Sequence, residues 1–249
     1  MAGLQFPFSE LLRETKALKG IAKDFLDPST TWALDELDSN INSIWGAAGG
    51  KAFSLQLQPL RTKRSAGAYE PGTRSGTVTI SAVITGTWDV QPLGDNPKKL
   101  KAKQSRLLEF CGVASTKIEL FDLSDPDHRI AMWRMELGAP DSPGCYFHVQ
   151  VLGDEDEPPF PRTLPIPRLP SLFITPMGVV EYVLGELFQD EWAKAAMGDS
   201  GDLPFWRELQ RTRLSRLLDW HRQVLAEVMS SPWMTIKDAK PDGRLFCNK

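Results

Sequence analysis

Apolar side chains recur at intervals of three and four along the start of the chain, the spacing of one face of an α-helix. Two such stripes are separated by Asp27-Pro28, because proline disfavours the α conformation of the residue before it. Ser29 or Thr30 can cap the second helix. The stripes are Phe8, Leu11, Leu12, Leu18, Ile21, Ala22 and Phe25, then Leu34, Leu37, Ile41, Ile44 and Trp45. Residues 1–50 are therefore predicted to form a helical part.

From about residue 52 the apolar period changes to two, which is typical of strands with one buried face. The clearest strand is GTVTISAVITGTWDVQ, where β-branched and apolar residues alternate with hydroxyl-bearing ones and Gly86 is a candidate bulge. Other candidates are FSLQLQ, RLLEFCGV, TKIELFDL, RIAMWRMEL and CYFHVQVL; polar turns such as DLSDPDHR and GAPDSPG separate the last three. This pattern predicts an antiparallel meander of five or six strands over residues 51–153.

Residues 154–174 open with acids and are dense in proline, which predicts an extended connector over the surface. The helical period then returns, with Thr175 as a cap and Pro176 at the first helical position. A second helix is expected to start near Asp202, so that residues 175–230 form a helical pair and 231–249 a tail. Helices followed by strands and then by helices indicate one α+β domain over residues 1–249.

Composition narrows the class of protein only moderately. The chain has 249 residues, of which 41% are hydrophobic and 24% charged, as in an ordinary folded protein. A net charge of −3 argues against a general nucleic-acid coat without excluding local basic patches. Three cysteines without a CxxC spacing fit a reduced compartment. With no long apolar run and no signal-like leader, we expect a soluble, cytoplasmic protein with no membrane contact.

Several common chemistries lack their motifs. There is no strand–glycine-loop–helix unit for a dinucleotide, no GxxxxGK[ST] loop and no GxSxG elbow. The KIELFD run has no lysine two positions after its glutamate, as a metal-dependent PD-(D/E)xK nuclease would need. The histidines and cysteines have no metal-ligand spacing, and DLSDPD lacks the glycine and distal glutamate of a calcium loop. We therefore expect neither a metal nor another cofactor.

The most informative stretch for function is FHVQV at 147–151, which alternates apolar with hydrogen-bonding side chains. If RIAMWRMEL and CYFHVQVL form a hairpin, placing Leu137 opposite Cys145 keeps both apolar sets on one face. In that register Arg134 lies beside His148, Glu136 beside Tyr146, and Met132 beside Gln150. The other face then displays one polar patch of Arg134, Glu136, Tyr146, His148 and Gln150.

This patch has two interpretations. Polar residues on an open sheet face are ordinary, and helices covering the face would leave the histidine in an internal hydrogen-bond network; this structural interpretation is favoured. Alternatively, Arg134, Glu136 and His148 can perform metal-independent phosphodiester cleavage, with two groups moving protons and the arginine stabilising charge on the phosphate. Tyr146 and Gln150 would then orient the base or phosphate. Arg168 of the connector is a candidate to reach the same face.

Two predicted loops are basic, and one histidine lies among leucines. The loops are 61–74, with Arg61, Lys63, Arg64 and Arg74, and 98–106, with Lys98, Lys99, Lys101, Lys103 and Arg106. They form either a phosphate-binding rim or, as we favour, solvated hairpin loops. A helical projection groups His221 with Leu214, Leu217, Leu218, Leu225 and Val228, which predicts a core histidine.

Three functions remain open. The leading hypothesis is a cytoplasmic, non-enzymatic interaction module or subunit of a larger complex, with another protein as its partner. Its exposed surface and the proline-rich connector would make the contact. The alternative is a metal-independent ribonuclease or related phosphodiesterase that uses Arg134, Glu136 and His148. A third is a passive nucleic-acid-binding subunit that uses the basic loops.

Overall fold

The computed structural model describes residues 3–47, 51–65, 79–93, 106–122, 125–138, 144–151, 169–172, 175–227 and 231–247. These ranges contain five helices and seven strands. In chain order they are β1 (Gln5–Pro7), α1 (Phe8–Ala22), α2 (Trp32–Ala47), β2 (Phe53–Arg61), β3 (Ile80–Leu93), β4 (Leu107–Asp122), β5 (Asp125–Leu137), β6 (Phe147–Val151), β7 (Leu169–Pro170), α3 (Pro176–Ala196), α4 (Leu203–Ala226) and α5 (Pro232–Asp238). Helices, an antiparallel sheet and further helices make this the α+β fold that the sequence predicts.

The sheet is a meander, as the alternating pattern predicts. Its order is β2-β3-β4-β5-β6-β7, every neighbouring pair is antiparallel, and β1 pairs with the start of β4. The two strands predicted at RLLEFCGV and TKIELFDL are one continuous strand, β4. Their apparent break is a bulge, because the register shifts between Trp88 and Val90 and the Val113 amide donates to the Asp89 side chain at 2.9 Å. Similarly, the predicted turn DLSDPDHR is largely strand, since β5 begins at Asp125.

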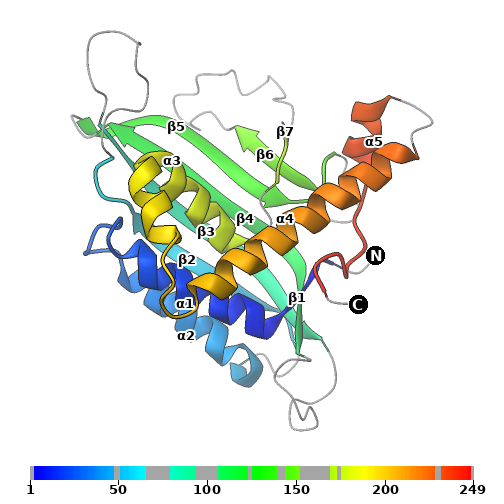
Figure 1. Ribbon diagram of the computed structural model, residues 1–249, viewed down its shortest axis with the longest axis horizontal. Coiled ribbons are helices and arrows are strands. Elements are labelled where there is room, and N and C mark those ends of the chain that lie inside the picture. Colours follow the sequence, from blue (N-terminus) through cyan, green and yellow to red (C-terminus); the bar gives the residue numbers. More distant parts are fainter. Residues whose placement is uncertain are drawn as a thin grey trace.

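Helices α3 and α4 cross one face of the sheet, and α1 and α2 lie along its β2 side (Figure 1). The covered face carries apolar residues from successive strands, such as Ile84, Ile118 and Met135. Gly86 belongs to this layer because the Trp88 indole lies over it: a Cβ there would be only 2.2 Å from the ring. The predicted bulge is not in Gly86 itself but opposite it, between Leu57 and Leu60 of β2.

The carboxy-terminal helices begin where predicted. Thr175 caps α3 by accepting a hydrogen bond from the Gly178 amide at 3.1 Å, and Pro176 is the first helical residue. Near its end α3 is kinked at Gln189, whose φ of 43° and ψ of −113° are not helical. The short elements β1, β7 and α5 were not predicted. No helix among the described residues combines the length and the apolar character needed to cross a membrane.

Candidate functional site

The predicted hairpin exists, but its register differs by two residues from the predicted one. Leu137 lies opposite Phe147 rather than Cys145, so that Glu136 faces His148 and Arg134 faces Gln150. Cys145 and Tyr146 belong to the loop instead, and the Gly138 amide donates to the Tyr146 carbonyl oxygen at 2.6 Å, which closes the hairpin. Because the shift is even, the assignment of polar and apolar faces is unchanged.

The new register builds a compact hydrogen-bonded pair from Glu136 and His148. His148 Nε2 lies 3.2 Å from Glu136 Oε2, and the Ser115 hydroxyl donates to Glu136 Oε1 at 2.9 Å. The hydrogen bond with His148 is the main cause that lowers the pKa of Glu136, and Ser115 adds to it against the effect of burial. His148 is only 2% exposed, so the imidazole belongs to an internal network.

The other members of the predicted patch do not join this pair. Tyr146 is buried, packs edge-on against Phe147 at 5.0 Å, and is hydrogen-bonded with the Leu4 backbone. Burial raises the pKa of Tyr146 to about 12. Arg134 and Gln150 face each other on the partly exposed part of β5 and β6. The structure therefore brings together two of the five predicted side chains as a hydrogen-bonded pair.

The described basic residues at the end of β2 contact the chain itself. The Arg61 guanidinium lies 5.5 Å from the centre of the Phe121 ring, and Lys63 Nζ donates to the Asp24 carbonyl oxygen at 2.7 Å. Arg64 donates to the Thr79 hydroxyl at 2.9 Å. Of the remaining candidates, Arg106 lies just before β4, and its carbonyl oxygen accepts a hydrogen bond from the Phe8 amide at 2.9 Å. The others, namely Arg74, Lys98, Lys99, Lys101, Lys103 and Arg168, lie outside the described residues.

The prediction that His221 lies on a core face is wrong. Of its predicted neighbours, Leu217 is buried, but Leu214, Leu218 and Leu225 are 38%, 53% and 37% exposed. The helix packs through Trp206, Arg213 and Leu217, about a quarter of a turn away from the three exposed leucines. His221 is half-buried, with its ring 4.6 Å from that of Trp220, and burial lowers its pKa.

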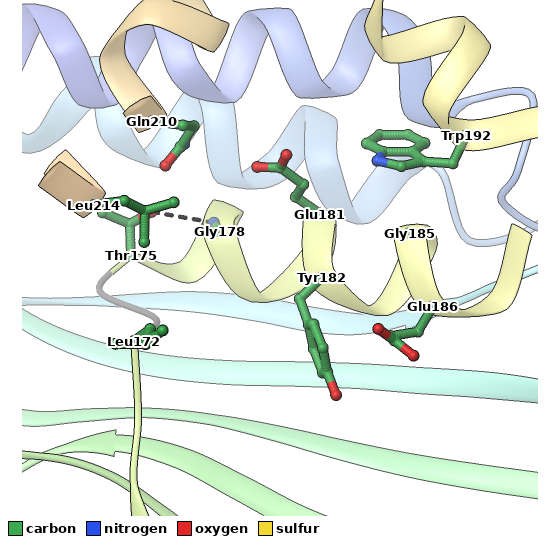
Figure 2. A pocket seen from close by; sticks show the side chains of 10 residues that line it. All are labelled: Leu172, Thr175, Gly178, Glu181, Tyr182, Gly185, Glu186, Trp192, Gln210 and Leu214. Carbon is green, nitrogen blue, oxygen red and sulfur yellow. Dashed lines mark hydrogen bonds between the residues drawn. The ribbon is translucent and has the colours of Figure 1, made fainter. Parts of the chain in front are cut away.

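A site that sequence reasoning missed lies between α3 and α4. A cavity of about 310 Å³ opens there, with walls that include Leu172, Tyr182, Trp192 and Leu214. Figure 2 shows Glu181, Gln210 and Trp192 on one side of the α3 ribbon and Tyr182 and Glu186 on the other, with Gly178 and Gly185 between them. We call this space the α3–α4 cavity. Its only signal in the sequence is the pair of glycines two turns apart in an otherwise apolar helix.

A buried ionic cluster connects α1, α3 and α4 beside this cavity. Glu14 of α1 is fully buried and accepts hydrogen bonds from Thr175 Oγ1 at 2.7 Å, Gln210 Nε2 at 2.5 Å and Arg213 Nη1 at 2.8 Å. Arg213 is also buried and supplies the compensating charge. A buried carboxylate is tolerated when it is paired and hydrogen-bonded in this way.

Glu181 has no such compensation. Its carboxylate makes no hydrogen bond or ion pair with the part of the chain that the structure describes. Burial raises the pKa of Glu181 to about 7, and the nearby charge of Glu14 adds to the effect. An apolar cavity with a few convergent polar groups and a perturbed carboxylate has the usual character of a ligand site.

Neither a cluster of metal ligands among the described residues nor a known relative identifies a ligand for the site. Among the described residues, no group of three or more His, Cys, Asp or Glu side chains is arranged to hold a metal ion. No protein family, curated protein or solved structure compared with the chain matches it.

Proposed function

We propose that the protein is a non-enzymatic, cytoplasmic interaction module that binds another protein through its helical side. The observation that carries this proposal is the exposed apolar face of α4 formed by Leu214, Leu218 and Leu225, which we call the α4 stripe. Apolar side chains four and seven residues apart along one helix form the type of surface that protein partners recognise. The three free thiols are consistent with a reducing compartment.

Further exposed apolar side chains lie beside the α3–α4 cavity and on α5, an element that contacts α4. Leu172 is exposed and lines the α3–α4 cavity together with Leu214. On α5, which contacts α4, Trp233 is 73% exposed and Met234 is also exposed. Tryptophan and methionine are enriched in protein interfaces, and a group of exposed apolar side chains favours a partner.

The alternative of a metal-independent phosphodiesterase has less support. A general acid or base must come within hydrogen-bonding distance of the substrate. The burial of His148 and its bond to Glu136 favour a structural role for both residues. Likewise, the contacts of Arg61, Lys63 and Arg64 with the chain itself reduce the support for a nucleic-acid surface there.

A photo-crosslinking experiment tests the interaction proposal. A benzophenone amino acid is placed at position 218 in the α4 stripe, and at position 223, an exposed polar position of the same helix, as the matched control. In native lysate we expect one defined protein to be crosslinked at 218 and not at 223. Size-exclusion chromatography with light scattering should then show a complex that Leu218→Glu abolishes and Gln223→Glu preserves.

Two outcomes would contradict the proposal. One is equal, diffuse crosslinking from both positions with a chain that elutes as a monomer. The other is a crosslink joining two copies of the chain, which would make the α4 stripe a self-association surface rather than a site for a different protein.

A further inference from the structure

We propose that the α3–α4 cavity binds an organic cation, namely an ammonium or guanidinium group carried on an apolar stem. This inference does not rest on the protein contact proposed for the α4 stripe. It follows from three properties of the cavity: the space beside two glycines, the hydrogen-bond acceptors in its walls, and an acidic side chain without a counter-ion among the described residues.

The space exists because α3 presents glycines to it. Gly178 and Gly185 both line the cavity, although glycine is among the least favourable residues in a helix interior. A Cβ at position 185 would lie 3.4 Å from Trp192 Cδ1, an ordinary contact distance, so alanine fits there and would occupy the space. The resulting volume of about 310 Å³ is enough for a small ligand or for one long side chain.

The walls suit the stem of such a ligand. Leu172 and Leu214 offer aliphatic surface, and Trp192 and Tyr182 offer aromatic surface. Cations held over aromatic rings are attracted by the ring electrons, most strongly over tryptophan. An alkyl chain ending in a cation would therefore find favourable contacts along its whole length.

The polar groups in the described walls include carboxylate and carbonyl acceptors beside the Trp192 indole N–H donor. Gln210 must direct its amide nitrogen to Glu14, since a carboxylate can only accept, and this leaves the Gln210 carbonyl oxygen for the cavity. The Thr175 hydroxyl also donates to Glu14. The Gln210 carbonyl oxygen and the Glu181 carboxylate can therefore accept hydrogen bonds from a cationic group, and the Glu181 charge disfavours an anion.

Glu181 supplies the charge that a cation would compensate. The neighbouring Glu14 already has Arg213 as its partner, whereas Glu181 makes no ion pair with the described residues. The raised pKa of Glu181 supports this assignment, because it reports a carboxylate whose negative charge lacks nearby positive charge.

The test compares isosteric probes that differ in charge. Isothermal titration calorimetry is carried out with n-butylguanidinium and with neutral n-butylurea, and again with N-acetylarginine N-methylamide and its citrulline counterpart. We expect each cation to bind at least about tenfold more tightly than its neutral partner. Binding of butylguanidinium alone identifies a free small cation, whereas binding of the arginine derivative as well identifies a basic side chain of a polypeptide.

Two variants check that the cavity is responsible. Glu181→Gln should remove the preference for the cation and leave the weak affinity for the urea unchanged. Gly185→Ala should weaken binding of all probes without lowering the melting temperature, because the added methyl group takes up part of the cavity. Gly20→Ala of α1 is the matched control, because an added Cβ meets nothing within 4 Å there, and it should bind as the wild type does. Leu218→Glu, which tests the α4 stripe, should also leave cation binding unchanged.

The pH dependence gives a further readout. The charged and titratable groups around Glu181 are Glu14 of α1, Tyr182 and Glu186 of α3, and Arg213 of α4. Burial raises the pKa of Glu181 to about 7. Affinity for the guanidinium should therefore rise about tenfold from about pH 6 to about pH 8 as Glu181 ionises, and Glu181→Gln should remove this rise.

Several results would overturn the proposal. Equal affinity for the cations and their ureas would exclude charge recognition. Unchanged cation affinity in Gly185→Ala would place binding outside the cavity. Absence of binding of every probe at millimolar concentration would exclude the site altogether.

Discussion

Glu136 on the sheet and Glu181 on α3 are the same residue type in opposite situations. Glu136 receives hydrogen bonds from His148 and Ser115, and its pKa is lowered. Glu181 has no partner among the described residues, and burial raises its pKa to about 7. We infer from this comparison that a carboxylate hydrogen-bonded by the chain itself is accounted for by the fold, whereas a carboxylate without a counter-charge is better evidence for a ligand.

The largest expected effect is a loss of stability when Glu14 is left without a positive partner, as Glu181 is among the described residues. Arg213→Met removes the positive charge beside the fully buried Glu14, and stability should fall by about 3–5 kcal/mol because an uncompensated charge is left inside. Urea unfolding near neutral pH measures this loss. Arg211→Met is the control, since Arg211 forms an exposed pair with Glu208 and should contribute less than about 1 kcal/mol. A small loss in Arg213→Met would mean that Glu14 is compensated without Arg213.

The next effect is a gain of stability on removal of the Glu181 charge. Its folded-state pKa of about 7 lies above the ordinary value of 4.5, so the folded state binds more protons between these limits. Stability should therefore fall as pH rises from about 4.5 to 7 and then level off. Above that window Glu181→Gln should be more stable than the wild type by up to about 3 kcal/mol, and near pH 4.5 the difference should vanish. Thermal unfolding across the pH range measures both, and a variant less stable at every pH would refute an uncompensated charge.

For Glu136, whose carboxylate is hydrogen-bonded, removal of its partner should lower the stability of the protein. His148→Ala leaves the partly buried Glu136 with Ser115 alone, and stability should fall by roughly 1–3 kcal/mol at neutral pH. The lowered pKa of Glu136 adds stability above about pH 4.5 that is lost as pH falls through its folded-state value, so the difference between variant and wild type should narrow in acid. Gln150→Ala on the same strand should change stability little. An unchanged melting temperature together with loss of an RNA-cleaving activity would instead support the phosphodiesterase alternative.

The smallest effect distinguishes a ligand cavity from a packing defect. Gly185→Ala should stabilise the protein by about 0.5–1 kcal/mol, because alanine is the better helix former and the added methyl group makes ordinary contact with Trp192. Gly20→Ala should give a similar gain. Chemical denaturation of both variants measures the two gains. If Gly185→Ala lost stability while Gly20→Ala did not, the space beside position 185 would be too small for an added methyl group.

Much of the fold could be predicted because its signals are local. The change of apolar period near residue 52, the break at Pro28 and the Thr175-Pro176 cap each depend on a few neighbouring residues. In contrast, β1, β7 and α5 have three, two and seven residues, which is too short to establish a period. Parity also cannot separate two registers that differ by two residues, because both keep Phe147 and Met135 on the apolar side.

The candidate site could not be predicted for a related reason. Glu14 and Arg213 are 199 positions apart, and no pattern in either helix indicates that they meet. A helical projection groups the leucines around His221 but does not say which side of α4 faces the core. That depends on where α1 and α3 lie. The two glycines of α3 were available as a signal, but they indicate open space only once α4 is placed beside them.

The position of Arg213 has a consequence for biosynthesis. Glu14 leaves the ribosome 199 residues before its cationic partner, so α1 must wait for almost the whole chain before its buried acid is neutralised. A chain that stops short of α4 lacks the positive charge that Arg213 places beside Glu14. The final docking of α1 is therefore coupled to α4, whereas α2 packs directly against β2.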